Sequence, residues 1–401
     1  RDRRSRRTLP PRTLARLVAA ATIVATRGGC STVKGWFSGK DKEGEKPVEP
    51  AELVDITPTA TVSKLWSANA GKGEKRLGLQ QVPAVADGRV YAAAVEGGVR
   101  AFDLQTGKQV WQYKSDLRLA GGPGAGQGLV VVGTLDGQVI ALDAATGAEK
   151  WQVKVPNEVI AAPAVGQGVV FVRSNDGRIT ALAADTGERR WFWTTELPSL
   201  TVRGNAPVVV GPGVVFAGSD DGTVTALAAN DGRPMWTQAV GIPEGRSELE
   251  RMADVDGAPV LEGTTLYATS FKKETVALEG PSGRPLWTRD NGGAGGLGVT
   301  SSAVVVSDPA GTVWGLDKYN GGALWSNTTL ARRSLTAPPI HGDYAVVGDY
   351  DGYLHWLKTD NGEVAARARV GGKAIRGKPV VADGILLVQD VEGGLTAFGF
   401  K

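Results

Sequence analysis

Residues 163–191 read PAVGQGVVFVRSNDGRITALAADTGERRW, and the fold can be worked out from this stretch. A β-branched run, VVFV, is separated by Asn175-Asp176-Gly177 from a second run, Arg178–Ala183, in which polar and apolar residues alternate. Asn, Asp and Gly tolerate the positive φ angles of a tight hairpin turn. Asp-Thr-Gly then predicts another turn, after which Trp191 begins the next strand. The stretch therefore predicts short antiparallel strands joined by tight turns.

The same pattern recurs along the chain as Gly-x-x-x-Trp, with one tryptophan standing before the first copy. Successive tryptophans lie 45, 40, 40, 45, 51 and 38 residues apart, the interval expected of propeller blades built from four short strands. A seventh unit carries Ala366 in place of the tryptophan, and an eighth ends at Lys401 after three strands. The repeat tryptophans are Trp66, Trp111, Trp151, Trp191, Trp236, Trp287 and Trp325.

These repeats predict an all-β protein, an eight-bladed β-propeller of four-stranded blades that occupies residues 59–401 as one domain. The N-terminal strand around Trp66 would pair with the C-terminal strands, which closes the ring and leaves no open edge at the seam. Each repeat tryptophan is expected to wedge between neighbouring blades and to bury about 150 to 250 Å². The 56 glycines among 401 residues fit a chain rich in turns.

The first residues differ from the repeats in composition. Residues 1–29 are rich in arginine and contain an apolar run, Leu17–Thr26, that is too short to span a membrane. This segment is predicted to be a signal peptide. Cys30, the one cysteine of the sequence, follows two glycines in a setting that resembles a bacterial lipoprotein signal, from which Arg27 departs because an apolar residue is usual there. Lipidation of Cys30 is expected, with an unmodified thiol as the alternative.

Residues 30–58 are polar and rich in Pro, Lys and Glu, which predicts a flexible tether between a lipid anchor and the propeller. Removal of residues 1–29 changes the formal net charge from +3 to −4. An acidic protein lacks the clustered basic face that nucleic-acid binding requires. We therefore expect attachment to a membrane through the lipid and no nucleic-acid partner.

The segment Ala141–Gly147, which precedes Trp151, resembles the repeat of quinoprotein-type propellers. Quinoprotein dehydrogenases hold pyrroloquinoline quinone and calcium at the ring axis, often under a disulfide of adjacent cysteines, for which this sequence has no second cysteine. The BamB family carries the same repeat, is a lipoprotein subunit of the outer-membrane β-barrel assembly (BAM) complex, and binds no cofactor. No His, Cys or Asp cluster in the sequence has metal-ligand spacing. The resemblance to BamB therefore implies a non-enzymatic protein without cofactor or metal.

Two longer connections between repeats, residues 198–207 and 247–256, closely resemble BamB motifs. In that family the two loops lie together on one face and dock onto the periplasmic POTRA domains of BamA. The resemblance implies that residues of both loops bind BamA, with Val202 standing where a leucine is common. These residues are Leu200, Val202, Arg203, Asp254 and Asp256.

The chemistry of these residues suits a small binding surface. Leu200 and Val202 lie two apart in an extended segment and so project to one side, and Arg203 can make a forked contact with a carboxylate. Asp254 and Asp256 share a face in the same way. An apolar pair beside an arginine and two carboxylates has the composition of a binding hot spot. The aspartates have an alternative role as an internal clamp that shapes the loop.

The expected function is that of a non-enzymatic scaffold, lipid-anchored at the periplasmic face of the outer membrane. It would bind the POTRA domains of BamA within the BAM complex and assist the folding and insertion of outer-membrane proteins. Unfolded outer-membrane proteins are a further expected partner. Two alternatives remain open: a small quinoprotein-like oxidoreductase, and a periplasmic propeller that binds another partner.

Overall fold

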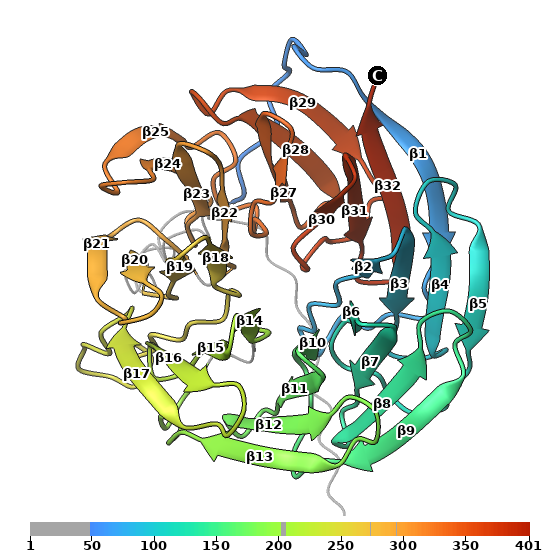
Figure 1. Cartoon of the computed structure of the whole chain (residues 1–401). Helices are drawn as coiled ribbons and strands as arrows, with labels where there is room; N and C mark the ends of the chain where they lie inside the picture. The colour runs from blue at the N-terminus through green and yellow to red at the C-terminus, as the bar shows by residue number, and fades with distance from the viewer. Residues whose placement is uncertain (1–48, 202–205, 273, 294) are drawn as a thin grey trace, which may run out of the picture. The chain divides into compact units, whose positions relative to one another are not determined.

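The computed structural model describes residues 49–401 apart from 202–205, 273 and 294. In this part of the chain 32 strands form eight sheets of four strands each. Figure 1 shows the sheets arranged as blades around a central axis, with the first strand of each consecutive group innermost. No helix among the described residues is both long enough and apolar enough to cross a membrane.

Blades 1 to 7 each use four consecutive strands, and blade 8 combines both ends of the chain. From the inner to the outer edge, the strands of the first three blades are β2 (Ala84–Ala86), β3 (Arg89–Ala93), β4 (Val99–Asp103) and β5 (Gln109–Tyr113) in blade 1; β6 (Gly124–Gly126), β7 (Leu129–Gly133), β8 (Gln138–Asp143) and β9 (Glu149–Lys154) in blade 2; and β10 (Ala164–Gly166), β11 (Val169–Arg173), β12 (Arg178–Ala183) and β13 (Arg189–Thr194) in blade 3. The next three blades contain β14 (Val209–Gly211), β15 (Val214–Gly218), β16 (Thr223–Ala228) and β17 (Pro234–Ala239) in blade 4; β18 (Val260–Glu262), β19 (Thr265–Thr269), β20 (Thr275–Glu279) and β21 (Pro285–Arg289) in blade 5; and β22 (Leu297–Val299), β23 (Ala303–Ser307), β24 (Val313–Asp317) and β25 (Ala323–Asn327) in blade 6. The last two contain β26 (Ile340–His341), β27 (Tyr344–Gly348), β28 (Tyr353–Lys358) and β29 (Val364–Arg369) in blade 7, and β30 (Val380–Ala382), β31 (Ile385–Gln389), β32 (Gly394–Phe400) and β1 (Val62–Asn69) in blade 8.

The first and last strands of the chain close the ring. β1 pairs antiparallel with β32, so that Val62 lies opposite Phe400 and Asn69 lies opposite Gly394. The predicted eight-bladed propeller of four-stranded blades, closed by the N-terminal strand, is therefore confirmed. Because the two chain ends share one sheet, the backbone groups of β32 that would face solvent at an open seam are paired.

The turn between the third and fourth strands of a blade is built by the Asp-x-x-Thr-Gly motif. In blade 2 the Asp143 carboxylate accepts hydrogen bonds from the hydroxyl and the backbone N–H of Thr146, both 2.9 Å long. These bonds hold the pKa of Asp143 below its ordinary value. Gly147 then adopts a φ of +75°, a conformation that costs other residues energy. The motif therefore has a structural task in each blade that carries it.

The glycine and the tryptophan of one Gly-x-x-x-Trp motif lie in two different interfaces between blades. The indole Nε1 of Trp151 in blade 2 donates to the carbonyl oxygen of Ala184 in blade 3. The same ring lies against Gly187 of blade 3, where an added Cβ would come within 2.7 Å of a ring carbon. Gly187 thus receives the tryptophan of the preceding blade, while Trp191 reaches the following blade. The seven Nε1 bonds of this kind run from Trp66 to Leu104, Trp111 to Ala144, Trp151 to Ala184, Trp191 to Ala229, Trp236 to Gly280, Trp287 to Lys318 and Trp325 to Thr359.

Blade 7 has Ala366 at the position of the outer-strand tryptophan, opposite Trp356 of β28. In the other blades the tryptophan packs on the turn between the third and fourth strands of its neighbour. Blade 8 has no such turn, because its third and fourth strands, β32 and β1, are not consecutive in the chain. The space is filled from β28 instead: Trp356 is fully buried and meets Phe398 edge-on, with ring centroids 5.8 Å apart.

Residues 49–60, which we call the strap, lie against blades 6 and 7 ahead of β1. The N–H of Ala51 donates to the carbonyl of Ala331 at 3.0 Å, and the N–H of Thr59 donates to that of Ala365 at 2.9 Å. The flexible tether predicted for residues 30–58 therefore needs correction over its last ten residues. These residues are bound to the propeller because Leu53 packs among the apolar side chains between the two blades and the strap carbonyls meet arginines.

Candidate functional site

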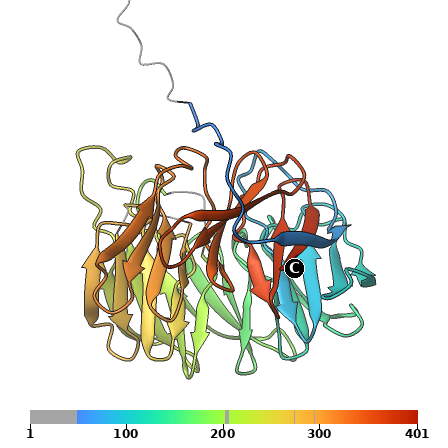
Figure 2. The ribbon, with the colours of Figure 1, turned by 90° about the horizontal axis from the view of Figure 1, so that it is seen from above.

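Two long connections carry the residues that the sequence analysis assigned to partner binding. Residues 195–208 join β13 to β14, and residues 240–259 join β17 to β18. Both begin at an outer strand and end at the next inner strand, so their described residues lie on the same face of the ring, the face from which the strap leaves (Figure 2). Leu200 lies on the first connection, whereas Val202 and Arg203 fall outside the described residues.

A groove separates the two connections, lined by Pro198–Leu200 on one side and by Pro243–Gly245, Glu248 and Arg251 on the other. The connections also expose aliphatic side chains to solvent. We call four of them the docking surface: Leu197, Leu200, Ile242 and Leu249, with exposed fractions of 43, 42, 57 and 67%. Exposed apolar patches on soluble proteins are common at interaction sites.

Of these four residues, only Leu200 belongs to the set that the sequence motifs predict for partner binding. Leu197 and Ile242 each precede a proline in a connection between strands. This aliphatic-Pro pair is the sequence feature by which the two exposed residues could have been predicted. Leu249 stands among charged residues within the 247–256 motif. No rule of sequence patterning separates it from a solvated turn.

The tip of the second connection is held by its own hydrogen bonds. The Glu250 carboxylate accepts from the N–H groups of Arg246 and Ser247 at 2.6 and 3.1 Å, and these bonds lower the pKa of Glu250. The Ser247 hydroxyl accepts from the N–H of Glu250 in return, at 3.2 Å. This reciprocal pattern is that of a capping box, and it presents Leu249 to solvent on an ordered turn.

Asp254 and Asp256 lie inside the fold and not on the docking surface, with exposed fractions of 0 and 9%. The backbone beside them is tied to its neighbours, because the N–H of Val255 donates to Ser219 O at 3.1 Å and the carbonyl of Asp254 accepts from the N–H of Phe271 at 2.8 Å. Their burial favours the internal clamp over direct contact with a partner. A role for Asp254 and Asp256 in partner binding would then be indirect, through the shape of the connection.

A buried ion pair holds the end of the first connection. Arg173, the last residue of β11, pairs with Asp220 at 2.5 Å and donates to the carbonyl of Ala206 at 3.4 Å. Burial raises the pKa of Asp220, while the charge of Arg173 acts in the opposite direction. Removal of one member of such a pair costs about 3 to 5 kcal/mol. In the sequence, the feature that indicates this ion pair is a charged residue, Arg173, at the end of an apolar strand.

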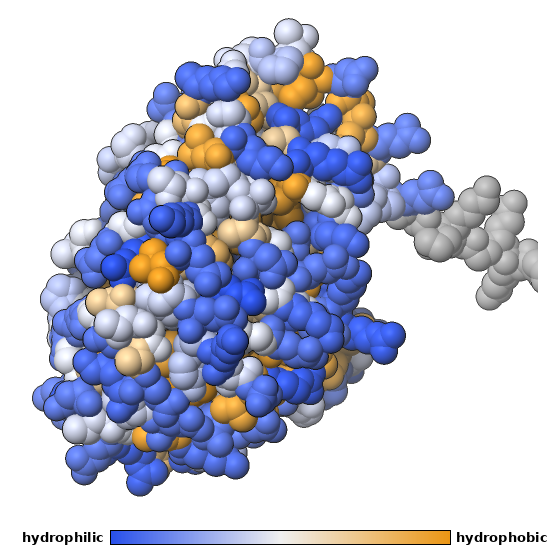
Figure 3. Space-filling model, turned by 90° about the vertical axis from the view of Figure 1, so that its right-hand side faces the viewer, coloured by the Kyte–Doolittle hydropathy of each residue, from blue (hydrophilic) through white to orange (hydrophobic). Residues whose placement is uncertain are grey.

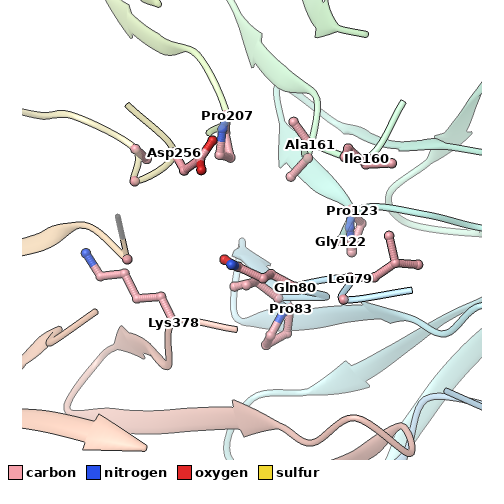
Figure 4. Close-up of a pocket in the computed structure, with 16 residues that line it drawn as sticks. Leu79, Gln80, Pro83, Gly122, Pro123, Ile160, Ala161, Pro207, Asp256 and Lys378 are labelled. Atoms are coloured by element: carbon pink, nitrogen blue, oxygen red, sulfur yellow. The ribbon is translucent and has the colours of Figure 1, made fainter. Parts of the chain in front are cut away.

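A second hollow lies at the ring axis, where the segments leading into the inner strands converge (Figure 4). It encloses about 240 Å³ and is lined mostly by apolar groups, including Leu79, Pro83 and Ile160. Asp256 and Lys378 are the charged side chains in its lining. Burial, aided by the charge of Asp254, raises the pKa of Asp256 well above its ordinary range. Burial lowers the pKa of Lys378 to about 8.

The axial pocket does not match the calcium and quinone site that the quinoprotein-type repeat suggests. Calcium takes about six to eight oxygen ligands, and Asp256 is the one carboxylate in the lining. Across residues 49–401, with the gaps stated above, no three His, Cys, Asp or Glu side chains are grouped to hold a metal. The lining therefore does not fit that pair of cofactors.

The side of the ring that Figure 3 shows is mostly hydrophilic, with separate apolar patches. In five blades the residue before the repeat tryptophan is an exposed aliphatic or methionine side chain, because neighbouring residues of a strand point to opposite faces. These residues are Leu65, Val110, Met235, Leu286 and Leu324. They occur one to a blade, in contrast to the docking surface.

Comparison with known proteins supports an assignment. The family model described as "Outer membrane protein assembly factor BamB" matches residues 53–118, 95–327 and 311–401. Proteins of that name from Xanthomonas campestris and Pseudomonas aeruginosa are 65% and 42% identical, over 96% and 90% of this chain and 97% and 96% of their own. The chain belongs to the BamB family. It is therefore related to factors named for outer-membrane protein assembly, not for an enzymatic activity.

Solved structures agree with membership of the BamB family. The crystal structure of BamB from Moraxella catarrhalis is 29% identical, has a TM-score of 0.77, and covers 85% of this chain and 100% of that chain. A quinohemoprotein alcohol dehydrogenase from Comamonas testosteroni has a TM-score of 0.67 at 15% identity, covering 88% and 79%. At that identity the likeness shows the propeller fold alone.

Proposed function

We propose that this BamB-family protein is a non-enzymatic lipoprotein scaffold that docks onto the periplasmic POTRA domains of BamA. Lipidated Cys30 would hold it at the periplasmic face of the outer membrane, and within the BAM complex it would assist the folding and insertion of outer-membrane proteins. Family membership supports the assembly role. The contact with BamA and the lipid anchor at Cys30 are further parts of the proposal.

The observation that carries the docking proposal is the docking surface itself. Burial of apolar surface is the main source of affinity in protein complexes, and a few anchors dominate it. Leu200 and Leu249 stand on different connections of one face, so a single partner domain can cover both. Arg203, beside this surface in sequence, would supply a forked hydrogen bond to the partner.

The buried charges support the same site indirectly. Arg173 holds Ala206 at the end of the first connection, and Val255 ties the second connection to blade 4. A connection fixed at its base loses less conformational entropy when its tip binds a partner. In this proposal Arg173 and the buried backbone at Asp254 and Val255 position the connections, and the exposed leucines make the contact.

A pull-down of the full chain with the POTRA domains of its own BamA tests the proposal. Leu249→Asp should weaken binding by about tenfold or more, because a charge replaces an apolar anchor at the centre of the contact. Leu286→Asp is the matched control: Leu286 is also an exposed leucine, on the outer wall of blade 5. Arg203→Ala and Leu200→Asp extend the test to the first connection.

Equal loss in Leu249→Asp and Leu286→Asp would point to a non-specific apolar effect and would contradict the proposed site. Absence of binding by the wild-type chain would contradict the BamA proposal as a whole. Circular dichroism of each variant shows whether the propeller has kept its fold, so that lost binding can be assigned to the surface.

A further inference from the structure

Asp256 is a buried carboxylate with both oxygens unsatisfied. It is 9% exposed, and neither Oδ1 nor Oδ2 has a hydrogen-bond partner among the residues that the structure describes. The nearby guanidinium of Arg173 is engaged by Asp220 and by the carbonyl of Ala206. Leaving a buried polar group unpaired costs free energy, so a carboxylate in this position calls for an explanation beyond packing.

The same carboxylate lines the axial pocket. Figure 4 shows Asp256, Lys378 and Pro207 around the hollow, entering from blades 5, 8 and 4. Lys378 Nζ donates one hydrogen bond, to the carbonyl of Leu297 at 2.8 Å, and an ammonium has three N–H groups to give. Lys378 and Asp256 do not form a hydrogen-bonded ion pair with each other, since the Asp256 oxygens have no hydrogen-bond partner within the described part of the chain.

An apolar hollow with a few converging polar groups is the usual form of a small-molecule site. The 240 Å³ of this hollow corresponds to about eight water molecules at ~30 Å³ each. Its two ionisable groups, the carboxyl of Asp256 and the amine of Lys378, come from different blades. A ligand that carries both a cation and an anion can satisfy the two with charge-assisted hydrogen bonds, which are stronger than those of a neutral ligand.

We propose that the axial pocket binds a small zwitterion of the amino-acid type, with its guanidinium or ammonium group on Asp256 and its carboxylate on Lys378. A guanidinium fits Asp256 best, because two parallel N–H groups match two free oxygens of one carboxylate. The remaining N–H groups of Lys378 would hold the carboxylate. The apolar wall, including Ile160 and Pro83, would cover the aliphatic part of the ligand.

This inference goes beyond the docking proposal and does not depend on it. The docking surface is on the exposed tips of the two connections, whereas the axial pocket lies among the segments that lead into the inner strands. Asp256 stands at the base of the second connection. An occupied pocket would therefore add support beneath the connection that presents Leu249.

Titration of the full chain with L-arginine up to about 10 mM tests the proposal. Calorimetry and the shift of the unfolding temperature measure the binding. Agmatine has the guanidinium but no carboxylate, and succinate has carboxylates but no cation. L-arginine should bind most tightly of the three. Asp256→Asn should weaken it about tenfold or more, because it removes a charge-assisted pair. Lys378→Met should remove the preference for L-arginine over agmatine.

Asp136→Asn, in an exposed hairpin of blade 2, is the control and should bind as the wild type does. Absence of binding by all three compounds overturns the proposal, and so does L-arginine binding that Asp256→Asn leaves unchanged. A capped tripeptide with arginine at its centre has the guanidinium but no free carboxylate. If it bound more tightly than free L-arginine, both to the wild type and to Lys378→Met, the assignment of a zwitterion would be overturned. None of these measurements uses BamA, so their failure is separate from that of the docking proposal.

Discussion

At the scale of single residues, the repeat depends on a glycine and a tryptophan that belong to different interfaces. Gly187 has a φ of +74° and faces the ring of Trp151. Gly168 has almost the same φ, +72°, but an added Cβ there would meet nothing within 4 Å. Alanine substitutions at these two glycines therefore distinguish the cost of backbone strain, which both share, from the cost of overlap with the tryptophan ring, which only Gly187 has.

We predict that Gly168→Ala costs about 1 kcal/mol of unfolding free energy through left-handed backbone strain. Gly187→Ala should cost about 1 to 3 kcal/mol more, because its Cβ overlaps the Trp151 ring. Trp151→Ala should itself cost about 3 to 5 kcal/mol. Urea unfolding of the single variants and of the Gly187→Ala, Trp151→Ala double variant measures the coupling. If the extra cost of Gly187→Ala persists without the tryptophan, the shared-interface account is wrong.

At the scale of elements, the strap is bound by arginines that converge on a buried histidine. Arg333 Nη1 donates to Ala51 O and Arg367 Nη1 donates to Val54 O, both at 2.9 Å. Asp349 accepts from Arg333 at 2.7 Å and lies 3.1 Å from His355 Nε2. Arg367 Nε donates to His355 Nδ1 at 3.2 Å, which requires a neutral imidazole with its proton on Nε2.

This arrangement makes the strap sensitive to acid. Burial lowers the pKa of His355 although Asp349 opposes the effect, and hydrogen bonds from His355, Tyr353 and Arg333 lower the pKa of Asp349 against its burial. Both shifts make the unfolded chain bind more protons, so stability falls as the pH falls. For His355 the loss begins near its ordinary value of 6.5 and is complete below its folded pKa.

We predict that hydrogen exchange at the N–H groups of Ala51 and Thr59, corrected for the intrinsic rate, speeds up between pH 7 and pH 5. The protection should fall by at most about tenfold per pH unit, because one proton is taken up. His355→Gln should remove the pH dependence. Amides in the middle of other blades, such as that of Val131 in β7, should not respond. An equal response in strap and core would show general acid destabilisation in place of a local clamp.

At the scale of the whole molecule, the ring depends on strand β1. Trp66 in that strand bonds Leu104 O of blade 1 at 2.9 Å and packs on Gly107, so β1 completes blade 8 and joins it to blade 1. Without it β32 would present an unpaired edge, which favours association between chains. The seam is the one place where the ring is held by strand pairing between the chain ends.

We predict that a chain beginning at Ala70 self-associates and unfolds at a lower temperature, while a chain beginning at Glu49 stays monomeric. The shorter chain loses the pairing of β1 with β32 and the Trp66 interface. Light scattering after size exclusion and thermal unfolding measure the two effects. A monomeric chain from Ala70 with an unchanged unfolding temperature would show that β1 does not close the ring.

The candidate site was only partly predictable, because its parts meet by folding. Leu200 could be named from a motif, but Leu197 and Ile242 gain their meaning from standing exposed on the same face. Arg173 and Asp220 pair across two blades, 47 residues apart. Arg367 and Val54 meet across 313 residues. Patterns within a repeat describe one blade and its neighbour, whereas these contacts combine segments that no local period connects.

The sequence by itself determined the fold, since a repeat that places glycine and tryptophan at fixed positions can bury both only by stacking blades into a closed ring. It also determined where the strand missing from blade 8 comes from. Only the tertiary structure decided that Asp254 and Asp256 are buried, that Asp256 faces the axis, and that residues 49–58 belong to the propeller. Burial is a property of the surroundings in three dimensions, and for a charged residue in a connection the local sequence does not specify those surroundings.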